Sequence, residues 1–159
     1  MASKPILDLG TLDLETVIAP AEEIRKVLAQ RGRLEMLDGI LYEDIEAEVL
    51  VGFKDIRADD WWACDHFPGR PVFPGALLIE SAAQLASYDY IRHRGTNFTG
   101  NVGFGGVDGT RFRAAVVPES RVIFVAKLAR ARASMFRYET QAFVDKQLVF
   151  EAQIMGVIF

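Results

Sequence analysis

The sequence is poor in the residue types that cross-link a small protein or bind a metal. One cysteine, Cys64, and two histidines, His66 and His93, occur among the 159 residues. A single cysteine excludes an internal disulfide and a multi-cysteine metal site, and it favours a reducing, cytoplasmic setting. We therefore expect a fold that is held together by its apolar core.

Two further absences limit the class of protein. No apolar run reaches the ~18–20 residues that cross a bilayer, and the N-terminus lacks the basic-then-apolar pattern of a secretory signal. The net charge of −4 argues against a nucleic-acid partner, because phosphate contacts need a basic face. With half of its residues hydrophobic, the chain is typical of one globular domain over residues 1–159.

The first half of the chain contains one clear helix start. Residues 1–19 carry scattered apolar positions without a period, and we expect a surface arm there. Residues 21–30 follow Pro20 with acids in the first turn and an apolar face, which predicts a short amphipathic helix. Alternation over residues 41–56 predicts one long strand. Residues 75–91 are apolar on nearly every side and predict a buried helix.

The second half is predicted to wrap that helix. After a glycine-rich loop over residues 95–109, four strands are expected, with a tight turn at Asp145 and Lys146. The expected strands are residues 111–117, 121–130, 135–144 and 147–158. The fold class is therefore α+β, with one long central helix wrapped by an antiparallel sheet.

The stretch from His66 to Gln84 combines a rigid loop with the start of the buried helix. Three prolines and two glycines stiffen and turn its first half, and the helix begins near Gly75. The first N–H groups of a helix have no partner within it and carry partial positive charge, so those near Gly75 and Ala76 can hold a ligand carbonyl.

Two side chains in this stretch are candidates for proton transfer. His66 is a general base candidate, and Glu80 is a general acid candidate because a carboxylate in an apolar helix needs a polar contact. Gln84 lies one turn further on the same face and can orient Glu80 or a water. A hydrogen-bonded structural histidine and a buried structural carboxylate remain the alternatives. His93 ends the predicted helix, where a cation is normal for structural reasons.

The same stretch resembles a known family. It matches all ten fixed positions of H-F-P-G-x-P-x-x-P-G-x-x-x-x-E-x-x-A-Q, the motif of the 3-hydroxyacyl-acyl carrier protein dehydratases of type II fatty acid synthesis. Residues 106–118 resemble the family's G-I-D-x-A-R-F-x-R-P-V-x-P segment, and residues 24–28 resemble its opening helix. The resemblance covers roughly residues 21–158 and implies the hot-dog fold.

The resemblance also implies a reaction. His66 would take the proton next to the thioester carbonyl, Glu80 would protonate the departing 3-hydroxyl, and the N–H of Gly75 would hold the carbonyl oxygen. The substrate would be a (3R)-3-hydroxyacyl thioester on acyl carrier protein, the product a trans-2-enoyl thioester, and no cofactor or metal would be needed. In the family His and Glu come from different subunits, which implies a homodimer with shared active sites, or a trimer of such dimers.

The sequence departs from the family at the borders of the site. The family's P-H-R-Y-P-F segment is Ala29-Gln30-Arg31-Gly32-Arg33-Leu34 here, and Asp65 replaces the glycine before the histidine. The acyl length and the carrier, acyl carrier protein or coenzyme A, are therefore left open. A basic cluster can meet an acidic carrier or form a solvated strand face. Its members are Lys127, Arg130, Arg132 and Arg137.

Other functions remain open on the same motif. A hot-dog thioesterase would use the helix carboxylate to activate water, and a non-catalytic partner subunit of a dehydratase would keep the fold without turnover. Cys64 lies near His66, but dehydration needs no covalent step and we assign it no nucleophilic role.

Overall fold

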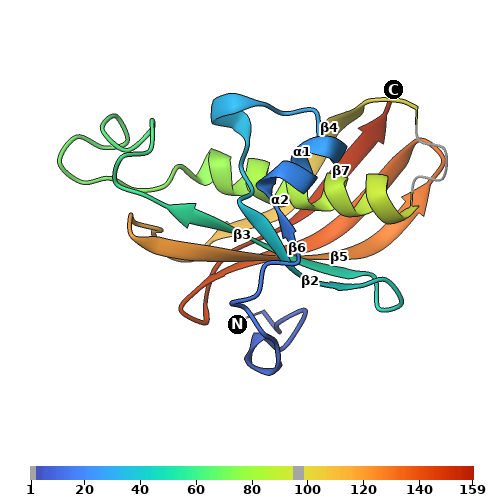
Figure 1. The fold of residues 1–159 in the computed structure, drawn as a ribbon, viewed down its shortest axis with the longest axis horizontal. Coiled ribbons are helices and arrows are strands. Elements are labelled where there is room, and N and C mark those ends of the chain that lie inside the picture. Colours follow the sequence, from blue (N-terminus) through green and yellow to red (C-terminus); the bar gives the residue numbers. More distant parts are fainter. Residues whose placement is uncertain (1–2, 95–98) are drawn as a thin grey trace.

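The computed structural model describes residues 3–94 and 99–159. One long helix lies against one face of a seven-stranded sheet (Figure 1). The strand order is β1-β2-β3-β5-β6-β7-β4, and all neighbouring strands are antiparallel. The elements are β1 (Ala19–Pro20), α1 (Ala21–Val27), β2 (Gly39–Asp44), β3 (Val49–Ile56), α2 (Gly75–Asp89), β4 (Val102–Phe112), β5 (Ser120–Arg132), β6 (Met135–Val144) and β7 (Gln147–Ile158), with short 3-10 helices at Leu9–Thr11 and Gly32–Leu34. The expected α+β arrangement of a central helix wrapped by an antiparallel sheet is confirmed.

Helix α2 is buried along most of its length, as its apolar sequence predicts. Leu78, Ala82 and Leu85 belong to the core cluster between the helix and the sheet. At the far end the Tyr138 hydroxyl of β6 donates a 2.5 Å hydrogen bond to Asp89. Burial, and then the Asp89 carboxylate, raise the pKa of Tyr138 above its usual value. The α-helix ends at Asp89 and continues as a π-helix over Tyr90–Arg94, slightly beyond the expected end.

The other predicted elements of regular pattern are present. Helix α1 is shorter than expected. Its Ile24 side chain is buried, and the acidic residues Glu22 and Glu23 lie in its first turn. Strands β6 and β7 have the expected bounds and are joined at Asp145 and Lys146, whose φ angles of 47° and 66° form a primed hairpin turn. His93 lies in the last turn of the π-helix, where its Nε2 is 2.9 Å from a Glu43 oxygen, which is a structural contact.

The prediction of one long strand over residues 41–56 is wrong, because a turn divides it into β2 and β3. The Asp44 carboxylate accepts a 2.8 Å hydrogen bond from the Ala47 N–H, and Glu48 has a φ of 60°. Such a side-chain bond to the backbone two or three residues ahead stabilises a turn. Ile45 continues the apolar alternation but is 54% exposed at that turn.

The predictions for residues 102–109 and 113–117 are also wrong, whereas residues 99–101 lie in a loop and residues 111–112 in a strand, as expected. Residues 95–98 lie outside the described part of the chain. Strand β4 occupies Val102–Phe112, so most of the expected loop is part of a strand. Residues 113–117, where a strand is expected, do not form one. The glycines of β4 permit close packing. A Cβ on Gly103 would stand 2.6 Å from the Phe159 ring, and one on Gly105 would stand 2.7 Å from Val157.

The two faces of the sheet are covered in different ways. The inner face packs on α2, and the outer face carries a second apolar cluster that includes Val51, Val125 and Phe143. Residues 3–14 run along this outer cluster, and their five larger apolar side chains pack onto it: Ile6, Leu7, Leu9, Leu12 and Leu14. None of the helices in the described part of the chain is long and apolar enough to span a membrane.

Candidate active site

The loop before α2 holds His66 by its own backbone. Trp62 and Phe73 are buried against each other in an edge-to-face contact, with ring centroids 5.3 Å apart. The His66 N–H donates to the Trp62 carbonyl at 2.9 Å, and the His66 carbonyl accepts from the Val72 N–H at 2.8 Å. The loop therefore fixes both sides of the histidine backbone.

A backbone carbonyl determines which nitrogen of the His66 ring can accept a proton. Its Nδ1 lies 2.7 Å from the Val72 carbonyl oxygen, which can only accept a hydrogen bond. Nδ1 must therefore carry the hydrogen, and in the neutral ring Nε2 has the free lone pair. The ring is half-buried and stacks on Phe67 at 4.0 Å between centroids.

The N-terminus of α2 presents unpaired backbone donors beside this loop. Pro74 is the N-cap residue and provides no side-chain hydrogen bond to the helix. The N–H groups of Gly75 and Ala76 precede the first intrahelical bonds and point out of the helix end. The Phe112 ring packs on Gly75, where an added Cβ would stand 2.8 Å from it. As the Phe112 ring lies, it leaves no room for a Cβ at this position.

Glu80 is held by Gln84, as the spacing on the helix predicts. The Gln84 Nε2 donates 2.7 Å hydrogen bonds to Glu80 Oε1 and to the Leu34 carbonyl. The Gln84 Oε1 accepts from the Met36 N–H at 3.0 Å. Because a backbone carbonyl can only accept and a backbone N–H can only donate, these partners determine which atom of the Gln84 amide is the nitrogen and which is the oxygen. Gln84 therefore presents an N–H to the half-buried carboxyl group of Glu80.

A small cavity of about 40 Å³ lies beside Glu80, between α2 and strands β4, β6 and β7. Glu80, Gln84 and Ser87 line it from the helix, and Phe104 lines it from β4. Gln30 lines the same cavity, and its Oε1 is buried without a hydrogen-bond partner among the described residues. Gln30 is not among the site residues that the sequence predicts. Its only signal was the departure from the family's P-H-R-Y-P-F segment.

The structure does not join all predicted site residues within one chain. Gly75, Ala76, Glu80 and Gln84 follow one another on α2, and His66 precedes them on the loop. In residues 3–94 and 99–159, no hydrogen bond links His66 to Glu80, and His66 is not part of the cavity beside Glu80.

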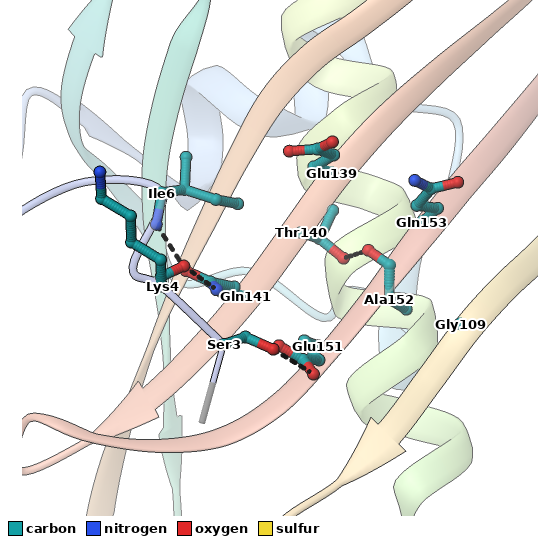
Figure 2. A pocket seen from close by; sticks show the side chains of 10 residues that line it. All are labelled: Ser3, Lys4, Ile6, Gly109, Glu139, Thr140, Gln141, Glu151, Ala152 and Gln153. Carbon is teal, nitrogen blue, oxygen red and sulfur yellow. Dashed lines mark hydrogen bonds between the residues drawn. The ribbon is translucent and has the colours of Figure 1, made fainter. Parts of the chain in front are cut away.

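A larger cavity of about 410 Å³ lies on the outer face, under the N-terminal arm. Figure 2 shows its lining, in which Gln141 bonds to the backbone of the arm and Ser3 bonds to Glu151. Arg113 also binds Glu151. Burial alone would raise the pKa of Glu151, but the hydrogen bonds from Ser3 and Arg113 hold it below its usual value. These polar groups attach the arm to the sheet.

The basic cluster predicted on β5 and β6 divides into paired and exposed members. Arg137 binds Asp108 at 3.3 Å and the Gln153 side chain at 3.0 Å. Lys127, Arg130 and Arg132 are exposed on β5. Arg137 is therefore paired within the chain, whereas the other three cations are exposed.

The fold is that of a hot-dog domain, with a histidine on the loop before its long helix and a carboxylate on that helix. Residues 28–153 match the family model described as a FabA-like domain. The chain belongs to this family, and the resemblance read from the motif is confirmed.

Relatives of high similarity to the chain include dehydratases. It is 38% identical over 137 residues to the 3-hydroxyacyl-[acyl-carrier-protein] dehydratase FabZ of Teredinibacter turnerae, covering 84% of this chain and 92% of the relative. The FabZ of Rhizobium rhizogenes is 36% identical over 151 residues, covering 93% and 94%. The solved dehydratase heterocomplex ApeI:P from Xenorhabdus doucetiae has a TM-score of 0.69 over 86% of this chain and 90% of that one. Its 12% identity means that this likeness shows the fold alone.

Proposed function

We propose that the protein dehydrates (3R)-3-hydroxyacyl thioesters on acyl carrier protein to trans-2-enoyl thioesters, in fatty acid or related acyl-chain biosynthesis. It is a hydro-lyase in this proposal. The observation that carries the proposal is the pair of proton-transfer groups, the His66 ring with a free Nε2 and the Glu80 carboxyl held by Gln84, in a chain related to FabZ dehydratases over most of its length.

The chemistry needs three groups and no cofactor. His66 Nε2 takes a proton from C2 of the acyl chain, and the N–H groups of Gly75 and Ala76 stabilise the negative charge that develops on the thioester oxygen. Glu80 then gives a proton to the 3-hydroxyl, the C3–O bond breaks, and water leaves. The imidazolium and the carboxylate return to their starting states by exchanging one proton with solvent.

Strand β4 supports the proposal that two chains share each site. It forms one edge of the sheet, is 11 residues long, and carries Phe104, Val107 and Phe112 at 48%, 37% and 54% exposure. A long edge strand with exposed apolar side chains is a template for pairing with another chain. A second copy of this strand, related by a two-fold axis, would satisfy the edge and cover these side chains.

The direction of β4 determines which parts of the two chains would meet. Its Phe112 end packs on Gly75 at the N-terminus of α2, and its Phe104 end lines the cavity beside Glu80. Antiparallel pairing of two copies reverses the strand, so the Phe112 end of one chain would lie beside the Phe104 end of the other. This arrangement would bring the helix N-terminus of one chain toward Glu80 of its partner. Assembly into a trimer of dimers, and a cytoplasmic location, remain predictions from the sequence.

The direct test is the reaction itself. Incubation with a 3-hydroxyacyl thioester of acyl carrier protein should give enoyl absorbance without release of free thiol. Free thiol without enoyl product would establish the thioesterase alternative. Absence of turnover with acyl carrier protein and coenzyme A substrates, together with stable binding to another subunit, would establish the non-catalytic one.

The assignment of residues has its own test. His66→Ala and Glu80→Gln should each lower kcat by roughly 10²–10⁴-fold, the usual contribution of a general acid or base. Circular dichroism and sedimentation should show the same fold and oligomeric state as the wild type. A rate near that of the wild type in either variant would contradict the assignment.

The exposed cations on β5 fit an acidic carrier domain. Reversing the charge of Arg130 and Arg132, as Arg130→Glu with Arg132→Glu, should raise KM for the acyl carrier protein substrate and leave KM for the coenzyme A substrate unchanged. Equal KM values for variant and wild type on acyl carrier protein would place the carrier elsewhere. A panel of substrates of increasing acyl length, including an aromatic one, would define the substrate range.

A further inference from the structure

Gln30 has a buried acceptor for which the described residues provide no donor. Gln30 lines the cavity beside Glu80, and its buried Oε1 has no hydrogen-bond partner among the described residues. Buried polar atoms in folded proteins are nearly always paired with protein groups or water. A side chain that lowers stability in this way is expected to have a partner during function.

The size of the cavity limits what that partner can be. At about 40 Å³ it is far below the roughly 300–1,000 Å³ of pockets that hold whole ligands. A water needs at least ~10–15 Å³ and two to four polar partners. The polar side chains of Gln30, Glu80, Gln84 and Ser87 line this cavity, so it suits one water or hydroxyl group rather than an acyl chain.

We propose that this cavity receives the departing oxygen of the substrate, and that Gln30 Oε1 accepts a hydrogen bond from the water as it forms. This inference rests on the proposed dehydratase function. Glu80 must lie within hydrogen-bond distance of the 3-hydroxyl that it protonates, and it lines the same small cavity. The C3–O bond breaks, the proton of Glu80 moves to the oxygen, and the resulting water has a new O–H that can donate to Gln30.

The segment that carries Gln30 is tied to the groups that orient Glu80. The Arg31 guanidinium donates to the backbone carbonyls of Gln30 and Leu28, each at 2.7 Å. A few residues further on, Leu34 and Met36 provide the two backbone groups that hold Gln84. One segment therefore positions the acid through Gln84 and offers an acceptor to the leaving group through Gln30.

The test compares Gln30→Met, which keeps the size of the side chain and removes the acceptor, with Gln30→Glu, which keeps an acceptor oxygen. Steady-state dehydration of a 3-hydroxyacyl-acyl carrier protein substrate should show kcat about 10-fold lower in Gln30→Met, the effect of one hydrogen bond made in the transition state, with KM unchanged. Gln30→Glu should retain more kcat than Gln30→Met.

The pH profile separates this role from a structural one. Glu80 is the only ionisable side chain among the described residues that line the cavity. A second carboxylate there adds a like charge beside Glu80, so the alkaline limb of the kcat profile should move to higher pH in Gln30→Glu. Gln147→Met, at an exposed glutamine at the start of β7, should match the wild type in both measurements.

Three outcomes would overturn the inference. They are a kcat of Gln30→Met within twofold of the wild type, an alkaline limb that does not move in Gln30→Glu, and a crystal structure of the dimer in which Gln30 Oε1 is bonded to the partner subunit. Absence of dehydration by the wild type would overturn the proposed function instead, so the two failures are distinguishable.

Discussion

Two glutamines, one on the inner side of the sheet and one on its outer side, each hold a neighbouring segment of the chain by its backbone. Gln84 on α2 bonds to the Leu34 carbonyl and the Met36 N–H, and Gln141 on β6 bonds to the Lys4 carbonyl and the Ile6 N–H. Each amide is buried, with 2% and 4% exposure, and each holds two backbone groups that are two residues apart.

The difference between the two glutamines is what else they touch. Gln84 also donates to Glu80, so one hydrogen-bond network holds both a backbone segment and the carboxyl group that we propose as the acid. Gln141 lies in the outer cavity, where its bonds attach the N-terminal arm. The comparison suggests that chemistry is confined to the inner face, and that the outer face contributes stability.

The largest expected effect is the recovery of activity when two inactive variants form mixed dimers, which tests whether two chains share each site. When His66→Ala and Glu80→Gln chains, each nearly inactive, are unfolded together and refolded, half of the dimers should be mixed. Each mixed dimer has one site with an intact His66 and an intact Glu80. Activity should therefore return to about a quarter of the wild-type value.

The control for this experiment is refolding of each variant alone, which should remain inactive. If the histidine and the acid of one site came from the same chain, a mixed dimer would have no intact site. A mixture as inactive as its components would then contradict the shared site.

A smaller effect on rate is expected from Gln84→Leu. The substitution removes the donor to Glu80 and leaves the Leu34 carbonyl and the Met36 N–H without their partner. Loss of orientation of the acid should lower kcat by about 10-fold, and each buried group left unpaired costs about 1–3 kcal/mol in the free energy of unfolding. Denaturant unfolding and steady-state kinetics measure the two losses. Unchanged kcat would mean that Gln84 does not orient Glu80.

The matched change on the outer face is Gln141→Leu. It should lower the free energy of unfolding by a similar amount, since it also leaves one carbonyl and one N–H unpaired. Because Gln141 has no contact with the catalytic groups, kcat should stay within twofold of the wild type. A loss of kcat as large as that of Gln84→Leu would contradict the separation of the two faces.

Most features of the inner face can be predicted from the sequence, because the patterns that indicate them involve residues close together in the chain. The bounds of β6 and β7 follow from alternation and from the turn at Asp145 and Lys146. The position of His66 on a stiff loop, and the spacing of Glu80 and Gln84 on one helix face, also follow from neighbouring residues. These features depend on contacts within a few positions of the chain.

The features that the sequence does not predict depend on distant partners. From the sequence alone, Gly103 and Gly105 indicate a loop. In the structure they are part of a strand, where Phe159 and Val157 pack against them. Gln84 bonds to groups 48 and 50 positions away, and Gln141 to groups 135 and 137 positions away, so neither attachment has a local signal. That Gln30 Oε1 finds no donor among the described residues is likewise a property of the packed structure.

The smallest expected effect is a pH dependence that belongs to the outer face alone. Hydrogen bonds from Ser3 and Arg113 hold the pKa of Glu151 below its ordinary value of 4.5. A carboxyl group whose pKa is lower in the folded state stabilises the fold above its unfolded pKa, and this contribution is lost as the pH falls through the folded pKa. Stability should therefore decrease below about pH 4.5, and in Glu151→Gln this part of the decrease should be absent. Denaturant unfolding between pH 3 and pH 7 measures the difference, and identical profiles for the two proteins would mean that the carboxylate does not hold the arm.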